Sequence, residues 1–186
     1  MIEHRVKGKL LINFKKEDGS SLTAVILLVI FVVYVFLPMF AAVIEKQIFS
    51  VRASDIRDSM EISCIAAYNS LNTGDLSKIA VTFDDDRLHQ VFTEYLVKNL
   101  RLNNDLTPKA TGSVAQGQVQ ISSIQEYISG FPLTCPDGNV LNRPTIHVKI
   151  IVPIEPTLYK YTILDLLGVD KIYCNVHLDV ELPVNQ

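Results

Sequence analysis

SSLTAVILLVIFVVYVFLPMFAAVI, residues 20–44, is a run of twenty-five amino acids that contains no charged side chain. At about 1.5 Å rise per residue, a helix of this length covers roughly 37 Å, whereas the hydrocarbon core of a bilayer is about 30 Å thick. The run therefore predicts a single transmembrane helix. Pro38 lies late in it, where we expect the ring to bend the helix rather than to end it.

A secretory signal peptide is the main alternative for an apolar run near an N-terminus. Such a signal has a shorter apolar core of about 7–15 residues and a small-x-small cleavage site. The one candidate tripeptide here, Phe40-Ala41-Ala42, begins with a bulky Phe. We therefore expect the run to stay in the mature protein. A buried helix of a soluble core is disfavoured, because such helices rarely run this long without a polar residue.

Basic residues are more frequent before the apolar run than after it. Before it they are Arg5, Lys7, Lys9, Lys15 and Lys16, and in a similar window after it Lys46, Arg52 and Arg57. By the positive-inside rule, residues 1–19 form a short cytoplasmic head and residues 45–186 form one domain outside the cell membrane. The lipid bilayer is the first expected partner. A net charge of −3 and the lack of a nucleic-acid-binding motif predict no nucleic-acid partner.

The residues that follow the run continue its helix and carry one apolar face. Residues 45–72 contain neither Gly nor Pro. Their apolar side chains recur at spacings of three and four, which places them on one stripe: Phe49, Ala53, Ile56, Met60, Cys64, Ala67 and Leu71. We predict one helix over residues 20–72, ended near Gly74, with Phe49, Ile56 and Met60 packed against a domain.

The rest of the chain predicts a second helix and an antiparallel sheet. One residue of the run Asp84-Asp85-Asp86 is expected to cap a helix over residues 85–102. Within residues 114–182 the apolar period changes to two, with a turn at residues 136–139, and the clearest alternation lies in residues 172–182. Residues 157–167 are expected to form a short helix or loop. The predicted fold class is α+β, with the long helix packed on a small antiparallel sheet.

Cysteine and histidine spacing predicts no metal site. Cys64, Cys135 and Cys174 lack the paired spacing of a zinc site; buried thiols are favoured over one disulfide with a thiol left over. The histidines are His4, His89, His147 and His177. His147 and His177 are expected on the solvent face of neighbouring strands, as ordinary surface residues rather than a cross-strand metal pair. The three-Asp run lacks the spacing and the glycine of a calcium loop.

No catalytic pattern is present either. The serines show no nucleophile elbow, and there is no glycine-rich phosphate-binding loop. We therefore predict a protein that is not an enzyme and that has no catalytic residue, metal or cofactor.

The order of segments resembles that of type IV pilins and pseudopilins. The shared features are a basic head, the junction Lys15-Lys16-Glu17-Asp18-Gly19 before Ser20, an apolar helix that continues as an amphipathic one, and an antiparallel sheet. More particularly, the chain resembles the TadE/TadG-like membrane proteins of tight-adherence pilus systems. The resemblance implies a prepilin peptidase as a partner, with cleavage between Gly19 and Ser20. It also implies a Glu at the fifth mature position, where this chain has Ala24. That departure favours an uncleaved accessory subunit.

The leading hypothesis is a non-enzymatic, single-pass subunit of a pilus-like or secretion apparatus. It would act by helix packing with other pilin-like or pilus-assembly subunits, with Ala41 and Ala42, next to Pro38, allowing close approach of another helix. The alternative is an extracytoplasmic binding or sensing domain on a membrane tether, although the nineteen-residue head is too short for an output domain. A membrane-bound hydrolase lacks a catalytic constellation.

Overall fold

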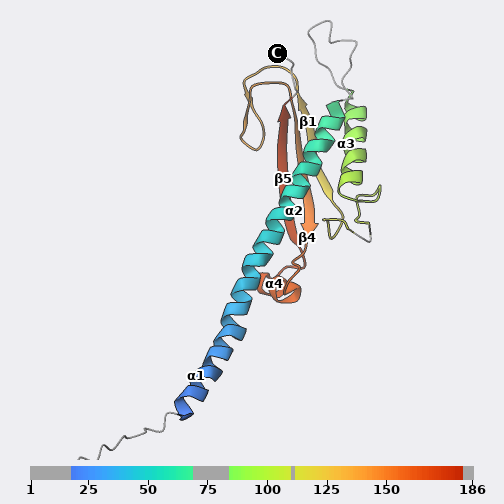
Figure 1. Cartoon of the computed structure of the whole chain (residues 1–186). Helices are drawn as coiled ribbons and strands as arrows, with labels where there is room; N and C mark the ends of the chain where they lie inside the picture. Colours follow the sequence, from blue (N-terminus) through green and yellow to red (C-terminus); the bar gives the residue numbers. More distant parts are fainter. Residues whose placement is uncertain (1–17, 69–83, 110–111, 182–186) are drawn as a thin grey trace, which may run out of the picture. The chain divides into compact units, whose positions relative to one another are not determined.

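The computed structural model describes residues 18–68, 84–109 and 112–181 (Figure 1). The chain divides into two compact units, Met1–Val43 and Ile44–Gln186. The fold class is α+β, as predicted: a long apolar helix near the N-terminus is followed by another long helix, a short helix and a small antiparallel sheet.

The described part of the first unit, from Asp18 onward, is helical and mostly apolar. α1 (Asp18–Phe31) leads into a π-helical turn, η1 (Val32–Phe36), after which α2 (Leu37–Ala67) begins. One continuous helix, Ser21–Ala67, is long and apolar enough to cross a membrane once, and none of its most apolar window is buried. The core helix of a soluble protein would be mostly buried, so the exposure of this segment is compatible with a single-pass membrane protein.

The π-helical turn lies directly before Pro38. Leu37 donates its backbone N–H to the carbonyl of Val32, five residues back. In a regular α-helix a proline lacks one N–H, and its ring crowds the carbonyl four residues earlier. A wider turn at this point relieves that crowding. The helix continues through Pro38, as the sequence predicted.

In the second unit, α2 buries one side in the core. Four residues of the predicted stripe are completely buried: Ile56, Met60, Cys64 and Ala67. Phe49 packs half-buried against the same core. Ala53 is partly buried, and Leu71 lies outside the described residues. α2 ends at Ala67, and Tyr68 forms a 3₁₀ turn. The predicted stop near Gly74 lies outside the described residues.

The second long helix, α3 (Asp85–Asn99), packs on the same core. Its buried residues are Leu88, Phe92 and Leu96. The carboxylate of Asp84 accepts the backbone N–H of Arg87 at 3.3 Å and caps the first turn, which confirms the predicted start. The helix ends at Asn99 rather than near residue 102, because Arg101 adopts a left-handed conformation with φ 54°.

Three antiparallel strands form the main sheet in the order β1-β4-β5. They are β1 (Gln120–Tyr127), β4 (Thr145–Ile154) and β5 (Ile172–Glu181). The central strand β4 directs one set of alternate side chains into the core shared with α2 and α3: Ile146, Val148, Ile150, Val152 and Ile154. The predicted half-buried strand at residues 172–182 is confirmed as β5, which begins at Ile172 and contributes Leu178 to this core.

A small hairpin covers part of the opposite face of the sheet. β2 (Leu133–Thr134) pairs with β3 (Val140–Leu141) around the predicted turn at residues 136–139. Side chains of this turn contact β4 and β5, through Lys149 Nζ to Asp137 Oδ1 at 2.6 Å and Asn139 Nδ2 to Asp179 Oδ2 at 2.7 Å. The face opposite the helices is therefore closed locally, and this closure creates the candidate site.

The segment after β4 is attached to the start of α2 in the second unit. Glu45 is 4% exposed, and its carboxylate accepts the backbone N–H groups of Thr157 and Leu158 at 2.8 and 2.7 Å. Arg52 donates to the carbonyl of Glu155 at 2.6 Å and to Thr157 Oγ1 at 2.8 Å. The short helix α4 (Lys160–Leu167) follows, as expected for residues 157–167.

Candidate metal centre

Two neighbouring strands bring three polar side chains together on the face away from the helices. In the β4–β5 register His147 lies opposite Asp179, and Lys149 lies opposite His177. Side chains at directly opposed positions of an antiparallel pair are about 4.5–5.5 Å apart at Cβ, and diagonal neighbours remain within reach of long side chains. His147 and His177 are thus diagonal neighbours, with a ring-centroid separation of 5.6 Å.

Cys135 reaches the same place from the hairpin. Its N–H donates to the carbonyl of Asn139 and its own carbonyl accepts the N–H of Gly138, both at 2.9 Å. Gly138 has φ +93°, a conformation that favours glycine, so the turn depends on this residue. The turn directs the Cys135 thiol toward Asp179, with Sγ 3.6 Å from Oδ2.

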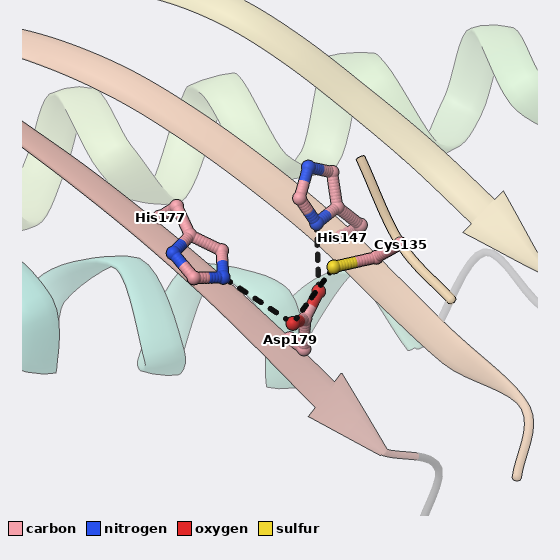
Figure 2. A group of neighbouring side chains, drawn as sticks. All are labelled: Cys135, His147, His177 and Asp179. Atoms are coloured by element: carbon pink, nitrogen blue, oxygen red, sulfur yellow. Dashed lines mark hydrogen bonds and ion pairs between the residues drawn. The ribbon is translucent and has the colours of Figure 1, made fainter. Parts of the chain in front are cut away.

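One side-chain atom from each of four residues converges at this point (Figure 2). The donor atoms of Cys135, His147, His177 and Asp179 all lie within 4.8 Å of one another. We call this group the Cys-His-His-Asp cluster. Cys135 is 3% and His147 1% exposed, whereas the side chain of His177 is 31% exposed. The cluster is therefore nearly closed, and His177 lies on its solvent side.

Asp179 is the centre of the hydrogen bonds within the cluster. Its Oδ1 lies 2.7 Å from His147 Nδ1, and its Oδ2 lies 3.3 Å from His177 Nε2. Burial alone would raise the pKa of Asp179, but hydrogen bonds from Asn139, His147 and His177 outweigh this effect and hold the pKa below its ordinary value. Asp179 is consequently a carboxylate at neutral pH.

The second ring nitrogen of His147 faces another carboxylate. His147 Nε2 lies 3.5 Å from Asp137 Oδ2, and the ring makes an edge contact with Tyr127 at 6.3 Å between centroids. The hydrogen bond from Lys149 lowers the pKa of Asp137, so this group is charged as well. His147 is therefore oriented on both sides, with Nδ1 toward the cluster and Nε2 toward Asp137.

The donor set suits a transition metal better than it suits nucleophilic catalysis. Thiolate, imidazole and carboxylate are the ligands that Zn²⁺ takes in proteins. A Cys-His-Asp triad would instead place the imidazole between thiol and carboxylate, with one nitrogen toward each. Here the two nitrogens of His147 face Asp179 and Asp137, and Cys135 is 3% exposed, so the thiol is poorly placed to attack a substrate.

No protein-family model, curated protein or solved structure matches the chain. The interpretation of the cluster and of the long helix therefore depends on their own geometry.

The site residues that the sequence singled out are not members of this cluster. Gly19 and Ser20 lie in the first turn of α1, and Pro38, Ala41 and Ala42 lie in the first turns of α2. Ala41 is half-buried and Ala42 is exposed. The predicted helix-packing residues Phe49, Ile56 and Met60 contact the core on the other side of the sheet.

The expected solvent-face position of His147 is wrong, and His177 is half-buried. Strand alternation correctly placed both side chains on the face opposite the helices. The turn of the hairpin at residues 136–139 was predicted too, but alternation carried no signal that this hairpin, whose strands have two residues each, shields that face. Asp179, two residues after His177 and opposite His147, was the signal that could have drawn attention to the site.

Proposed function

We propose that this chain is a non-enzymatic, membrane-anchored subunit of a pilus-like or secretion apparatus, with residues 45–186 outside the cytoplasm. The observation that supports the proposal is the change of environment along one helix. Its apolar window is exposed, while residues 56–67 of the same helix carry a stripe buried in the core of an α+β domain. A helix of this kind suits a subunit that packs laterally in the bilayer and presents a small domain outside.

A second face of α2 offers a surface for contact with other subunits. Four apolar side chains of the second unit are exposed on this helix: Ile44, Val51, Ile62 and Ile65. At about 100° per residue, these positions fall within one narrow sector. Asp55 and Asp58 lie in the same sector, so the face combines apolar contacts with charge. Helix packing through such a face is how the proposed subunit would meet a pilin-like partner.

Crosslinking in native membranes tests this proposal. A photoreactive amino acid at Ile62 is expected to crosslink to a second copy or to a subunit with a similar apolar N-terminal helix, identified by mass spectrometry. The matched control is the same amino acid at Tyr173, an exposed residue of β5. Crosslinking at neither position, together with purification as a monomer, would contradict the proposal.

Processing of the N-terminus belongs to the same proposal. Cleavage between Gly19 and Ser20 would expose an amino group at the start of the apolar run, and Ala24 supplies no carboxylate to pair with it. An unpaired charge in the hydrocarbon region is costly. We therefore expect an uncleaved chain anchored by Lys15 and Lys16. The intact mass of the protein from its own membrane tests this, and a mature start at Ser20 would place it nearer the true pilins.

A membrane-tethered binding domain is the second candidate, and one observation favours it. The Cys-His-His-Asp cluster gathers four side chains of the kinds that bind metal ions, in a domain that follows an apolar helix. Under this candidate, the cluster would be the functional part and the helix only a tether. Crosslinking at Ile62 separates the two candidates, because a simple tether needs no defined neighbour.

A further inference from the structure

We propose that the Cys-His-His-Asp cluster binds one zinc-class divalent transition metal ion and that the ion holds the β2–β3 hairpin on the sheet. The ligands would be Cys135 Sγ, His147 Nδ1, His177 Nε2 and one carboxylate oxygen of Asp179. This inference goes beyond the proposed membrane function and does not depend on it.

The distances fit a metal after a small contraction. The four donor atoms lie within 4.8 Å of one another. In a tetrahedral zinc site, bond lengths of about 2.0–2.3 Å put neighbouring ligand atoms roughly 3.3–3.8 Å apart. Closing the difference needs movements on the order of 1 Å, which side-chain rotation supplies because Cys135 lies in a turn and His177 is partly exposed.

The surroundings of His147 are those of a metal ligand. Binding through Nδ1 leaves the ring proton on Nε2, which faces Asp137 Oδ2 at 3.5 Å. Metal-binding histidines usually donate their second N–H to a carboxylate or carbonyl, and this contact fixes the ring. Asp137 is itself held by Lys149 Nζ at 2.6 Å. The second carboxylate thus already faces Nε2 and needs to come only slightly closer to accept its N–H.

The ligand set and its closure indicate the kind of ion and its role. A thiolate with two imidazoles favours Zn²⁺ and similar ions over Mg²⁺ and Ca²⁺, which prefer oxygen ligands. Four protein ligands fill a tetrahedral shell and leave no open position, which is typical of structural rather than catalytic zinc. The three protein segments that supply them are the hairpin turn, β4 and β5. The ion would therefore act as a clamp between them.

Metal binding is tested on the full chain in detergent micelles. After treatment with a chelator and removal of the chelator, we expect the protein to take up one Zn²⁺ per chain, to melt several degrees higher with Zn²⁺, and to show no such shift with Mg²⁺ or Ca²⁺. Co²⁺ as a probe should give the visible absorption of a tetrahedral site with a thiolate ligand.

Matched variants assign the binding to the cluster. Cys135→Ser and His177→Gln should each reduce Zn²⁺ affinity at least 100-fold, while Asp137→Asn should reduce it about 10–100-fold because it removes only the support of His147. The controls are Cys174→Ser and His89→Gln, a thiol and an imidazole that lie outside the cluster. His177 is partly exposed, so its variant should fold even if Cys135→Ser does not.

Proteolysis tests the clamp separately from binding. The turn at residues 136–139 is exposed, and we expect Zn²⁺ to slow cleavage there several-fold relative to chelator. Equal cleavage with and without bound Zn²⁺ would overturn the clamp. Absence of Zn²⁺ binding by the wild-type chain, or equal binding by the cluster variants and the controls, would overturn the site and leave a hydrogen-bonded polar cluster only.

Discussion

Glu45 is the first charged residue after the apolar run, and it is almost completely buried. Its carboxylate accepts two backbone N–H groups, from Thr157 and Leu158. Hydrogen bonds to a charged group contribute about 1.5–3 kcal/mol each when they are shielded from water. One side chain thus holds a loop of the domain against the helix at the residue where the apolar sequence ends.

Replacement of Glu45 tests this attachment. Glu45→Ala should lower the free energy of unfolding by about 3 kcal/mol, the low end for two such hydrogen bonds, because two N–H groups lose their acceptor. Glu45→Gln should retain part of the effect, since its amide oxygen still accepts. Lys46→Ala, an exposed neighbour, should change stability by less than about 0.5 kcal/mol. The measurement is denaturation of the full chain in micelles, followed by near-ultraviolet circular dichroism of its tyrosines. If Glu45→Ala proved as stable as Lys46→Ala, the loop would need no acceptor here.

Glu126 illustrates the opposite case, a carboxyl in an unfavourable place. Its Oε2 atom is buried and forms no hydrogen bond with any of the described residues. Burial raises its pKa, and the charge of Asp85 adds to the shift. Because the folded-state pKa is the higher one, the free energy of unfolding falls as pH rises from the ordinary pKa of a Glu through the raised value.

Glu126→Gln should therefore stabilise the protein at neutral pH and make no difference at a pH below the ordinary Glu pKa. The gain should stay below about 1 kcal/mol, because the side chain is only partly buried and solvent screens its charge. Glu94→Gln, at an exposed position of α3, is the matched control. The measurement is thermal unfolding of both variants and the wild type, at neutral pH and at a pH below the ordinary Glu pKa. A gain that persists in acid would mean that the pKa of Glu126 is not its cause.

At the level of elements, α2 has one buried face and one exposed face, and neighbouring residues can belong to different faces. Ile56 is completely buried in the core, and Arg57 beside it is exposed. Ile56→Asp should cost several kcal/mol, because it places an unpaired charge among apolar side chains. Arg57→Asp should be tolerated. We expect Ile56→Asp to lose the native near-ultraviolet circular dichroism of the tyrosines and Arg57→Asp to keep it. If both variants kept it, the stripe would not face a core.

The elements that could be predicted from sequence are those whose signal is local. The stripe on α2, the cap at Asp84 and the alternation in β5 follow from neighbouring residues. The candidate metal centre was not predictable in this way. Its ligands come from three segments, and Cys135 lies in a hairpin whose short strands carry almost no periodic pattern. Alternation along a strand tells which side a residue faces, but not what covers that side.

At the level of the whole molecule, the expected sidedness makes a direct prediction. Protease added to intact cells without their wall should degrade residues 45–186 and leave the basic head intact, because the lysines and arginine of the head favour the cytoplasmic side. Antibodies against each end would follow the fragments. Permeabilised cells provide the control, in which both parts should be degraded. Protection of the large domain in intact cells would reverse the orientation.

The burial of Cys64 makes this thiol a built-in reporter of core opening. Burial, helped by the charge of Glu61, raises the pKa of the Cys64 thiol to about 12, and the side chain is completely buried. A thiol reagent needs both contact and thiolate, so Cys64 should react only in chains whose core has opened. The partly exposed Cys174 should react first. Dividing the labelling rate of Cys64 by its rate in denaturant would then give the fraction of molecules that are open at any moment, without any added probe.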